Sequence, residues 1–255
     1  MTADLVALGD ANYYEAWAML ARAAYDGDVR DLDGVLVTTA GTPVLWLNIA
    51  FVTRRLPDPE AQLSAARAYF DERGLPFLVR IREGLDEDAE RAAGRLGMPY
   101  TDTIPGMALD PIPPAPDATA PLAIEEVDAR TLDAFVTLNA EAFDIPLEAC
   151  RKVLPPDILE EPHAHWYLGL ADGKPAATSG LVITDGIAGV HFVSTDATYR
   201  RRGFGEAMTR HAALEGRKRG LSVAYLQSSE MGYPVYERMG YRRVTGYKTF
   251  VTKET

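Results

Sequence analysis

Apolar residues recur with two different periods along the chain, and these periods predict helices and strands. Spacings of three and four residues, typical of a helix that buries one face, predict helices at residues 10–24, 58–73, 86–96, 128–143, 146–154 and 204–219. Alternating or β-branched runs between turn residues predict strands at residues 35–39, 44–53, 75–81, 165–170, 175–183, 187–195, 221–227 and 242–252. The order of these elements indicates a protein of the α/β (α+β) class.

A segment rich in proline and alanine separates two halves of this pattern. Residues 110–120 have the sequence DPIPPAPDATA, which has no apolar period and is typical of a linker between domains. We therefore predict a first domain at residues 1–109, a linker at 110–122 and a second domain at 123–255.

The two halves resemble each other. When Gly74 is aligned with Gly220, each glycine ends a predicted helix and precedes a predicted strand, at 75–81 and at 221–227. Glycine is favoured there because it adopts the left-handed conformation that ends many helices. A repeat of this length predicts two copies of one fold.

Composition and charge restrict the class of protein. An apolar fraction of 47% and a charged fraction of 25% are typical of a soluble globular chain. The net charge of −11 argues against nucleic acid as a partner, because contacts with phosphate need a basic surface. No apolar run approaches the ~18 residues that span a bilayer, so we expect no membrane partner.

The first residues and the cysteine content indicate a compartment. The N-terminal stretch MTADLVALGDANYYEA lacks the basic and apolar regions of a signal peptide. The single cysteine, Cys150, cannot form an internal disulfide, which suits a reducing compartment. We therefore expect a cytoplasmic protein.

The stretch most indicative of function is VSTDATYRRRGFGE, residues 193–206. A predicted strand ends there, a basic turn follows, and Gly203 and Gly205 lead into a predicted helix. Glycine lets the backbone approach a ligand closely, and the free N–H groups of a helix N-terminus favour an anion. The turn therefore predicts a pyrophosphate site, although three arginines in a row also occur in solvated turns.

Two motifs carry a resemblance to a known family. The run Arg200-Arg201-Arg202-Gly203-Phe204-Gly205 resembles the Gln/Arg-x-x-Gly-x-Gly/Ala signature of the GNAT-type N-acetyltransferase superfamily. The segment Tyr236-Glu237-Arg238-Met239-Gly240-Tyr241 resembles the second mark of that family, a Tyr-Glu-Lys-Leu-Gly-Phe-like run. The resemblance covers residues 123–253, and with the repeat it implies two GNAT-like domains, each a mixed, mostly antiparallel twisted sheet flanked by helices.

The resemblance implies acetyl-CoA as the co-substrate and no metal ion. Its diphosphate would lie on the backbone amides of residues 201–206, and backbone groups of Val193 and Thr195 would hold its pantetheine arm. The residues that the resemblance places at acetyl-CoA are Val193, Ser194, Thr195, Arg200, Arg201, Arg202, Gly203, Phe204, Gly205, Glu206 and Ser229. Ser229 stands where many relatives have an asparagine, which leaves its role open. The sequence also shows no His/Cys/Asp cluster with metal-ligand spacing.

The first half differs at the positions that match the glycines. In the alignment of the halves, Pro57 falls on Gly203 and Pro59 falls on Gly205. Proline has no backbone N–H group and a fixed φ, so these positions lose donors that the second half keeps. We therefore predict that the first half is a degenerate copy, which keeps the scaffold and does not bind the cofactor.

Tyr236 matches the tyrosine that, in the family, hydrogen-bonds the sulfur and serves as general acid. A phenol has a pKa near 10, so at neutral pH it is protonated and can donate. The alternative is that Tyr236 packs beneath the last strand, a role that Tyr233 or Tyr241 fills equally well.

The general base is less well defined. His191 lies on the strand before the turn, and an imidazole suits proton removal near neutral pH. Glu230 is a comparable candidate, and Glu141 or Glu148 would act only through water. A base is also dispensable where the amine binds in its neutral form.

We therefore expect an acyltransferase that moves an acetyl group from acetyl-CoA directly to a primary amine of a small molecule. Direct transfer needs no acyl-enzyme, so Cys150 is expected to be a buried helix residue. The alternatives are acetylation of protein lysines or N-termini, and a non-catalytic acyl-CoA-binding regulatory protein. Either a monomer or a homodimer is compatible with this sequence.

Overall fold

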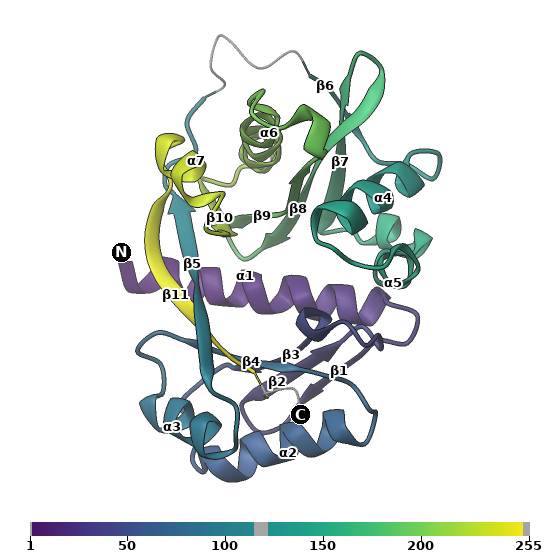
Figure 1. The fold of residues 1–255 in the computed structure, drawn as a ribbon. Coiled ribbons are helices and arrows are strands. Elements are labelled where there is room, and N and C mark those ends of the chain that lie inside the picture. The colour runs from purple at the N-terminus through teal and green to yellow at the C-terminus, as the bar shows by residue number, and fades with distance from the viewer. Residues whose placement is uncertain (1, 115–121, 252–255) are drawn as a thin grey trace.

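The computed structural model describes residues 2–114 and 122–251, and these residues form one continuous eleven-stranded sheet with helices on its faces (Figure 1). The strand order is β1-β2-β3-β4-β11-β5-β10-β9-β8-β7-β6. Only the pairs β3–β4 and β9–β10 are parallel, so the sheet is mixed and mostly antiparallel. The predicted fold class is thereby confirmed.

The elements follow each other in a similar order in the two halves. The first half contains α1 (Thr2–Ala23), β1 (Asp28–Asp31), β2 (Val35–Thr39), the 3-10 helix η1 (Leu45–Leu47), β3 (Asn48–Val52), α2 (Pro59–Asp71), β4 (Leu78–Arg82), α3 (Glu87–Arg95) and β5 (Tyr100–Leu109). The second half contains β6 (Ala123–Glu126), α4 (Leu132–Ala142), α5 (Leu147–Val153), η2 (Pro156–Glu160), β7 (Ala164–Ala171), β8 (Lys174–Thr184), β9 (Ile187–Thr195), η3 (Ala197–Tyr199), α6 (Phe204–Lys218), β10 (Val223–Gln227), α7 (Tyr233–Arg238) and β11 (Arg242–Val251).

Each half contains one parallel strand–helix–strand unit, which is β3–α2–β4 in the first half and β9–α6–β10 in the second. Both helices bury one apolar face, which includes Phe70 in α2 and Met208 in α6. Both are followed by a glycine with positive φ, Gly74 at 62° and Gly220 at 87°. These glycines are the pair on which the sequence repeat was aligned, and they reverse the chain into β4 and β10.

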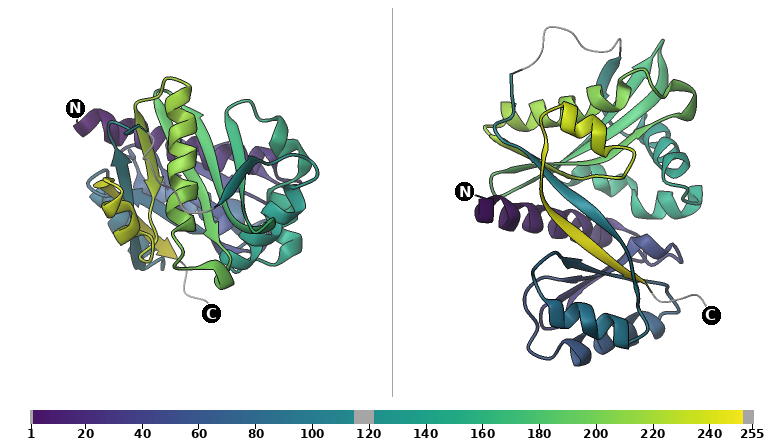
Figure 2. Two further views of the ribbon diagram at one scale, coloured as in Figure 1. Left: turned by 90° about the horizontal axis from the view of Figure 1, so that it is seen from above. Right: turned by 60° about the vertical axis from the view of Figure 1, so that its left-hand side comes forward.

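The two halves exchange their last strands. β5, which ends the first half, pairs with β10 of the second half, and β11, which ends the second half, pairs with β4 of the first. β5 and β11 also pair with each other along most of their length, and Figure 2 shows them as a twisted ribbon that connects the halves. The division of the chain into domains at residues 109 and 123 stays a prediction. In space, the sheet of each half includes a strand from the other half.

Helix α1 lies across the junction between the halves (Figure 1). Its Asp10 accepts hydrogen bonds from Arg82 Nε of β4 (2.7 Å) and from the Tyr247 hydroxyl of β11 (2.8 Å). The Tyr247 hydroxyl also lies 2.7 Å from that of Tyr225 in β10. Burial raises the pKa of Asp10, while the hydrogen bond from Tyr247 and the charge of Arg82 oppose this rise. One carboxylate therefore connects α1 to strands of both halves.

Some boundaries differ from the prediction for local reasons. α4 begins at Leu132 and not at residue 128, because the Asp128 carboxylate accepts the N–H groups of Arg130 and Thr131 and forms a turn. The predicted strand 44–53 is split, because residues 45–47 form η1 and only 48–52 form β3. α1 extends to Thr2, well before the predicted start.

Three strands were not anticipated. β1 and β6 are short and β5 begins with exposed polar residues, so none shows a clear apolar alternation. Within the predicted linker, residues 115–121 lie outside the described residues. The described Ile112 is buried, and its N–H group donates to Ser222 O at 2.7 Å.

We expect Asp10→Ala to lower the free energy of unfolding by about 3 kcal/mol, because it leaves the half-buried Arg82 without its charge partner and the buried Tyr247 hydroxyl without an acceptor. Urea denaturation measures this change. The matched control is Glu15→Ala on the same helix, whose ion pair with Arg22 is exposed and should contribute little. Equal effects of the two substitutions would show that the Asp10 network does not hold the halves together.

Candidate active site

The two parallel strands of the second half pair only at their beginnings. The pairing joins Ile187, Ala188 and Gly189 of β9 to Val223, Ala224 and Tyr225 of β10. Beyond this point β9 continues to Thr195 and β10 to Gln227 without pairing with each other. The predicted cofactor residues Val193, Ser194 and Thr195 lie on this unpaired part of β9, so backbone groups on that edge are available to a ligand.

A bulge in β9 marks the place where the strands part. Phe192 has a φ of 51°, and the register against β8 shifts between the pairs Gly180–His191 and Thr178–Ser194. The Thr178 hydroxyl stabilises the bulge, since it lies 2.8 Å from Phe192 O and 2.7 Å from the Ser194 hydroxyl. A bulge of this kind redirects side chains, and here it brings Phe192 onto the face that carries α1 and α4.

The basic turn after β9 has the geometry that its glycines predicted. Arg201 and Gly203 have φ values of 63° and 80°, and α6 begins at the next residue, Phe204. Among the described residues, no acceptor receives a hydrogen bond from the backbone N–H groups of residues 201–206. Successive free amides at a helix N-terminus form a concave anion site.

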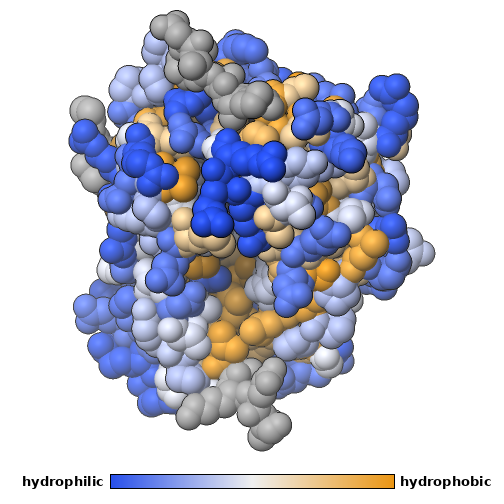
Figure 3. Space-filling view, turned by 45° about the horizontal axis from the view of Figure 1, so that its top comes forward, coloured by the Kyte–Doolittle hydropathy of each residue, from blue (hydrophilic) through white to orange (hydrophobic). Residues whose placement is uncertain are grey.

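The three arginines of the turn are exposed and carry uncompensated charge. None of Arg200, Arg201 and Arg202 forms an ion pair with a described residue. Arg202 lies over the ring of Tyr199 at 5.2 Å, and Arg200 Nε approaches Thr195 O at 3.4 Å. The turn is therefore locally positive on a protein of net charge −11. Figure 3 shows a hollow with strongly hydrophilic side chains on its upper rim and hydrophobic ones inside and below it.

Gly205 has no internal packing reason to be glycine. A Cβ at this position would lie 3.5 Å from the Thr195 hydroxyl, an ordinary contact. The helix that follows would gain from a Cβ, because glycine is a poor helix former. Close approach of a ligand, which the sequence predicts here, would account for the missing side chain and stays a prediction.

Tyr236 lies on α7, opposite the first turns of α6. Its phenol is partly buried beside the Thr209 hydroxyl and 5.9 Å from the ring of Tyr241. Burial raises the pKa of Tyr236, and the neighbouring Thr209 hydroxyl acts in the opposite direction. The phenol therefore keeps its proton at neutral pH. Tyr241 is fully buried in the core, which gives it the packing role that the sequence left open.

His191 lies on β9 at the place where the strands part, and it faces α1. Its Nε2 atom is 3.2 Å from Asn12 Oδ1. Burial lowers the pKa of His191 to about 4, so the imidazole is neutral at physiological pH. A neutral imidazole can accept a proton, although the lowered pKa makes it a weak base.

The other sequence candidates lie further from the parted strands or have other contacts. Glu230 is exposed beyond the end of β10, and the Ser229 hydroxyl accepts the Gly232 N–H at 3.1 Å at the start of α7. Glu148 forms an exposed ion pair with Arg151. Cys150 is buried, and burial raises the pKa of its thiol to about 12, so it is protonated and not a nucleophile.

Sequence reasoning missed a row of partly exposed aromatic side chains. Trp17 of α1, Trp46 of η1, Phe143 after α4 and Phe192 of β9 contact each other in this order, with ring centroids 6.0, 6.0 and 6.2 Å apart. Trp17, Trp46 and Phe192 pack on the core beneath α1 and α4, and Phe143 is exposed beside them. They come from both halves of the chain, so no local pattern could have identified them.

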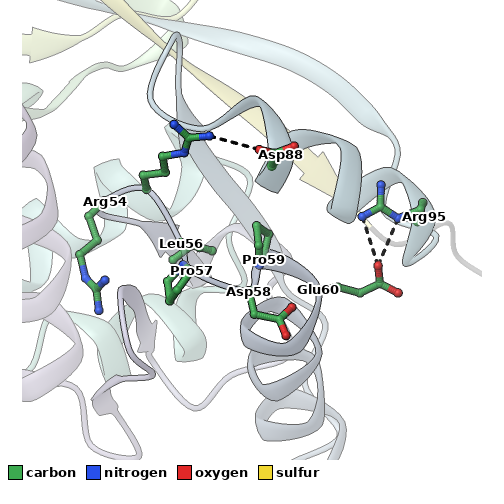
Figure 4. A pocket seen from close by; sticks show the side chains of 9 residues that line it. Arg54, Leu56, Pro57, Asp58, Pro59, Glu60, Asp88 and Arg95 are labelled. Atoms are coloured by element: carbon green, nitrogen blue, oxygen red, sulfur yellow. Dashed lines mark hydrogen bonds and ion pairs between the residues drawn. The ribbon is translucent and has the colours of Figure 1, made fainter.

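Figure 4 shows the side chains of the matching turn in the first half, and carboxylates near this turn accept hydrogen bonds from several backbone amides. The Asp58 carboxylate accepts the Ala61 N–H at 3.1 Å, at the start of α2. The Asp86 carboxylate accepts the N–H groups of Leu56 (2.7 Å) and Ala89 (3.0 Å). Acidic side chains of the chain itself therefore occupy the place that an anionic ligand would take.

The surroundings of this first-half turn also differ from those of the second half. A cavity of about 640 Å³ lies there, but it is lined by acids as well as arginines, and Arg95 pairs with Glu60 at 3.1 Å. β3 and β4 stay paired from Ile49 to Val52, so these strands do not part. The first half therefore differs from the second in paired charges, in acceptors for its amides and in strands that stay paired, and the loss of the cofactor site stays a prediction.

The comparisons with known proteins agree with this geometry. Residues 124–244 match the sequence model of the acetyltransferase (GNAT) domain. The fold is similar to a GCN5-related N-acetyltransferase from Kribbella flavida (19% identity, TM-score 0.74, 97% of this chain and 96% of that chain) and to one from Sphaerobacter thermophilus (18%, 0.64, 93% and 92%). It is also similar to a tandem GNAT protein from the clavulanic acid biosynthesis pathway (11%, 0.61, 97% and 96%). No curated protein matches the chain.

The parted strands, the open turn and the match over residues 124–244 define a GNAT-type acyltransferase domain. This domain, residues 124–244, belongs to the GNAT acetyltransferases, and the whole chain has a fold similar to that of a tandem GNAT protein. No described helix has the length and apolar character to cross a membrane.

We expect the wild-type protein to lose more stability than His191→Gln as the pH falls from 7 to 4.5. The unfolded histidine has a pKa near 6.5 and the folded one about 4, so between these values the unfolded chain binds the extra proton and acid favours unfolding. Urea denaturation at several pH values measures the difference. Burial also lowers the pKa of His211. Because His211 is present in both proteins, its contribution to the pH dependence of stability cancels in the comparison. Parallel losses in the two proteins would contradict the expectation.

Proposed function

We propose that the second half transfers an acetyl group from acetyl-CoA directly to a primary amine of a small molecule. The single observation that carries this proposal is the combination of parted strands β9 and β10 with unpaired amides at the start of α6. Together they form a slot for an extended chain with an anion site at one end. Coenzyme A has this shape and charge, because a pantetheine arm extends from its diphosphate.

The residues of the turn and of β9 divide the binding of the coenzyme between them. The amides of residues 201–206 hold the diphosphate, and the side chains of Arg200, Arg201 and Arg202 add charge-assisted contacts. The backbone of residues 193–195 pairs with the pantetheine arm in place of β10. This fixes the thioester beside the bulge at Phe192, where positioning lowers the barrier.

The transfer itself needs one bond exchange and two proton movements. The amine nitrogen bonds to the acetyl carbonyl carbon, and the bond from this carbon to the coenzyme sulfur breaks. Tyr236 gives its phenolic proton to the departing thiolate, and His191 takes a proton from the nitrogen. Exchange with water then restores both side chains. We assign His191 this role over Glu230 because it lies at the parted strands and is neutral.

The aromatic row indicates the kind of amine. Trp17, Trp46, Phe143 and Phe192 offer partly exposed rings on the face of His191, and the row ends at the bulge itself. Aromatic surfaces favour apolar and aromatic groups. We therefore infer an acceptor whose amine is attached to an apolar or aromatic frame.

We expect Gly205→Val to weaken acetyl-CoA binding at least about tenfold, which is 1.4 kcal/mol, because the new side chain occupies space next to the diphosphate site. Calorimetric titration measures the affinity. Pro59→Val, at the matching position of the first half, is the control and should bind as the wild type does. A wild-type protein without affinity for acetyl-CoA, or an equal loss in both variants, would contradict the location of the site.

We expect Tyr236→Phe to lower kcat by about 10² to 10⁴, the usual range for loss of a general acid, while acetyl-CoA affinity stays within about threefold. Release of free thiol with a panel of amines measures turnover. Tyr233→Phe on the same helix is the matched control and should retain activity. Binding without turnover on any small amine or lysine peptide would instead indicate a non-catalytic acyl-CoA-binding protein. Turnover confined to peptides would indicate protein acetylation.

We expect Phe143→Ala to lower kcat/KM for an arylalkylamine by about tenfold, in line with the ~1.5 kcal/mol of a buried aromatic contact, and to change a short alkylamine much less. Tyr25→Ala, which also removes an exposed aromatic side chain but lies outside the row, is the control. Equal effects on the two amines would show that the row does not contact the acceptor.

A further inference from the structure

Among the described residues, the side chain of Asn12, in the first half, makes hydrogen bonds only with residues of the second half. It lies on α1 and is fully buried. Its Nδ2 atom donates to Val182 O and to the Thr184 hydroxyl of β8, both at 3.0 Å, and its Oδ1 atom lies 3.2 Å from His191 Nε2 of β9. All three polar contacts of this amide therefore reach the strands beside the predicted active site.

These contacts fix which way the amide points. A backbone carbonyl such as Val182 O can only accept, so the atom that faces it must be the NH₂ group of Asn12. Reversing the amide would place two acceptors against each other. The atom that faces His191 is consequently the carbonyl oxygen Oδ1.

The orientation of the amide in turn fixes the proton on His191. Oδ1 can only accept, so the Nε2 atom of His191 carries the proton in this hydrogen bond. A neutral imidazole has one N–H group, which leaves Nδ1 with a free lone pair. No described residue donates a hydrogen bond to Nδ1.

The backbone of β9 is adapted to Asn12. A Cβ at Gly189, two positions before His191, would overlap the Asn12 side chain. Gly189 is also the last residue of β9 that pairs with β10. The amide therefore enters the sheet at the vertex of the parted strands, where only glycine leaves room for it.

We propose that Asn12 is a positioning residue that holds His191 in the Nε2–H tautomer, so that Nδ1 is presented to the acceptor amine as the proton acceptor. This role rests on the proposed function of the second half. It gives the first half, which lacks the features of a cofactor site, a part in the reaction. Without Asn12, both tautomers of His191 become accessible. In the tautomer that carries its proton on Nδ1, this atom cannot accept a proton from the amine.

The test is ¹⁵N NMR of the full-length protein labelled at histidine, because ring nitrogens with and without a proton differ strongly in chemical shift. The chain contains only four histidines, and His191→Gln identifies the signal of His191. At pH 7 we expect the wild type to show a neutral ring with a protonated Nε2 and an unprotonated Nδ1. We expect Asn12→Leu, which keeps the volume and removes the acceptor, to show a mixture of tautomers.

Activity is measured on the same proteins. We expect Asn12→Leu to lower kcat by about 10- to 100-fold with little change in acetyl-CoA affinity. Asn48→Leu is the matched control, because Asn48 is equally buried but its contacts are all within the first half. It should destabilise the protein without altering the His191 spectrum or kcat.

Several results would overturn the proposal. A wild-type His191 that is protonated on Nδ1, or charged, at pH 7 excludes the tautomer, and this measurement needs no variant that folds. An unchanged spectrum in Asn12→Leu excludes the role of Asn12. A kcat of His191→Gln equal to that of the wild type excludes His191 as the proton acceptor. The protein could also show the expected spectra and yet acetylate no amine. This result would contradict the proposed function and would still support the control of the His191 tautomer by Asn12.

Discussion

The binding ability of each half depends on what satisfies the backbone amides at the start of one helix. The helix after a parallel strand leaves N–H groups without partners, and an acceptor must be found for them. In the first half, Asp58 accepts the Ala61 N–H at the start of α2 and Asp86 accepts the Leu56 N–H just before it. In the second half, no described residue does so for residues 201–206. The two turns therefore differ in whether the chain itself supplies acceptors for these amides, and on this difference rests the proposal that only the second half binds the coenzyme.

The exchange of β5 and β11 makes the two copies one structural unit. Neither half has a complete sheet without the strand of the other, and the Asp10–Arg82–Tyr247 network lies at the same junction. α1 adds a second connection, since it packs on strands of both halves. The first half therefore supplies its neighbour with strand β5 beside β10, with the helix α1 and with side chains beside the parted strands.

Much of the site could be predicted from local sequence, and particular residues show why. Gly203 and Gly205 were identified because backbone geometry near an anion permits few other residues, and Gly203 indeed has a positive φ. The two prolines of the first half predicted missing donors for the same reason. The role of the Asp58 and Asp86 carboxylates was not anticipated. Either a side chain of the protein or a bound ligand can accept hydrogen bonds from free backbone N–H groups, and the sequence does not show which one does.

The sequence alone determined most of the element order, the glycine turn and the family resemblance, because each depends on residues close together in the chain. It did not determine the exchanged strands, since β5 and β11 have the same local pattern whichever partner they pair with. It also did not determine the contact of Asn12 with His191 or the row from Trp17 to Phe192. These contacts join residues that are far apart in sequence, and only the folding of both halves around α1 brings them together.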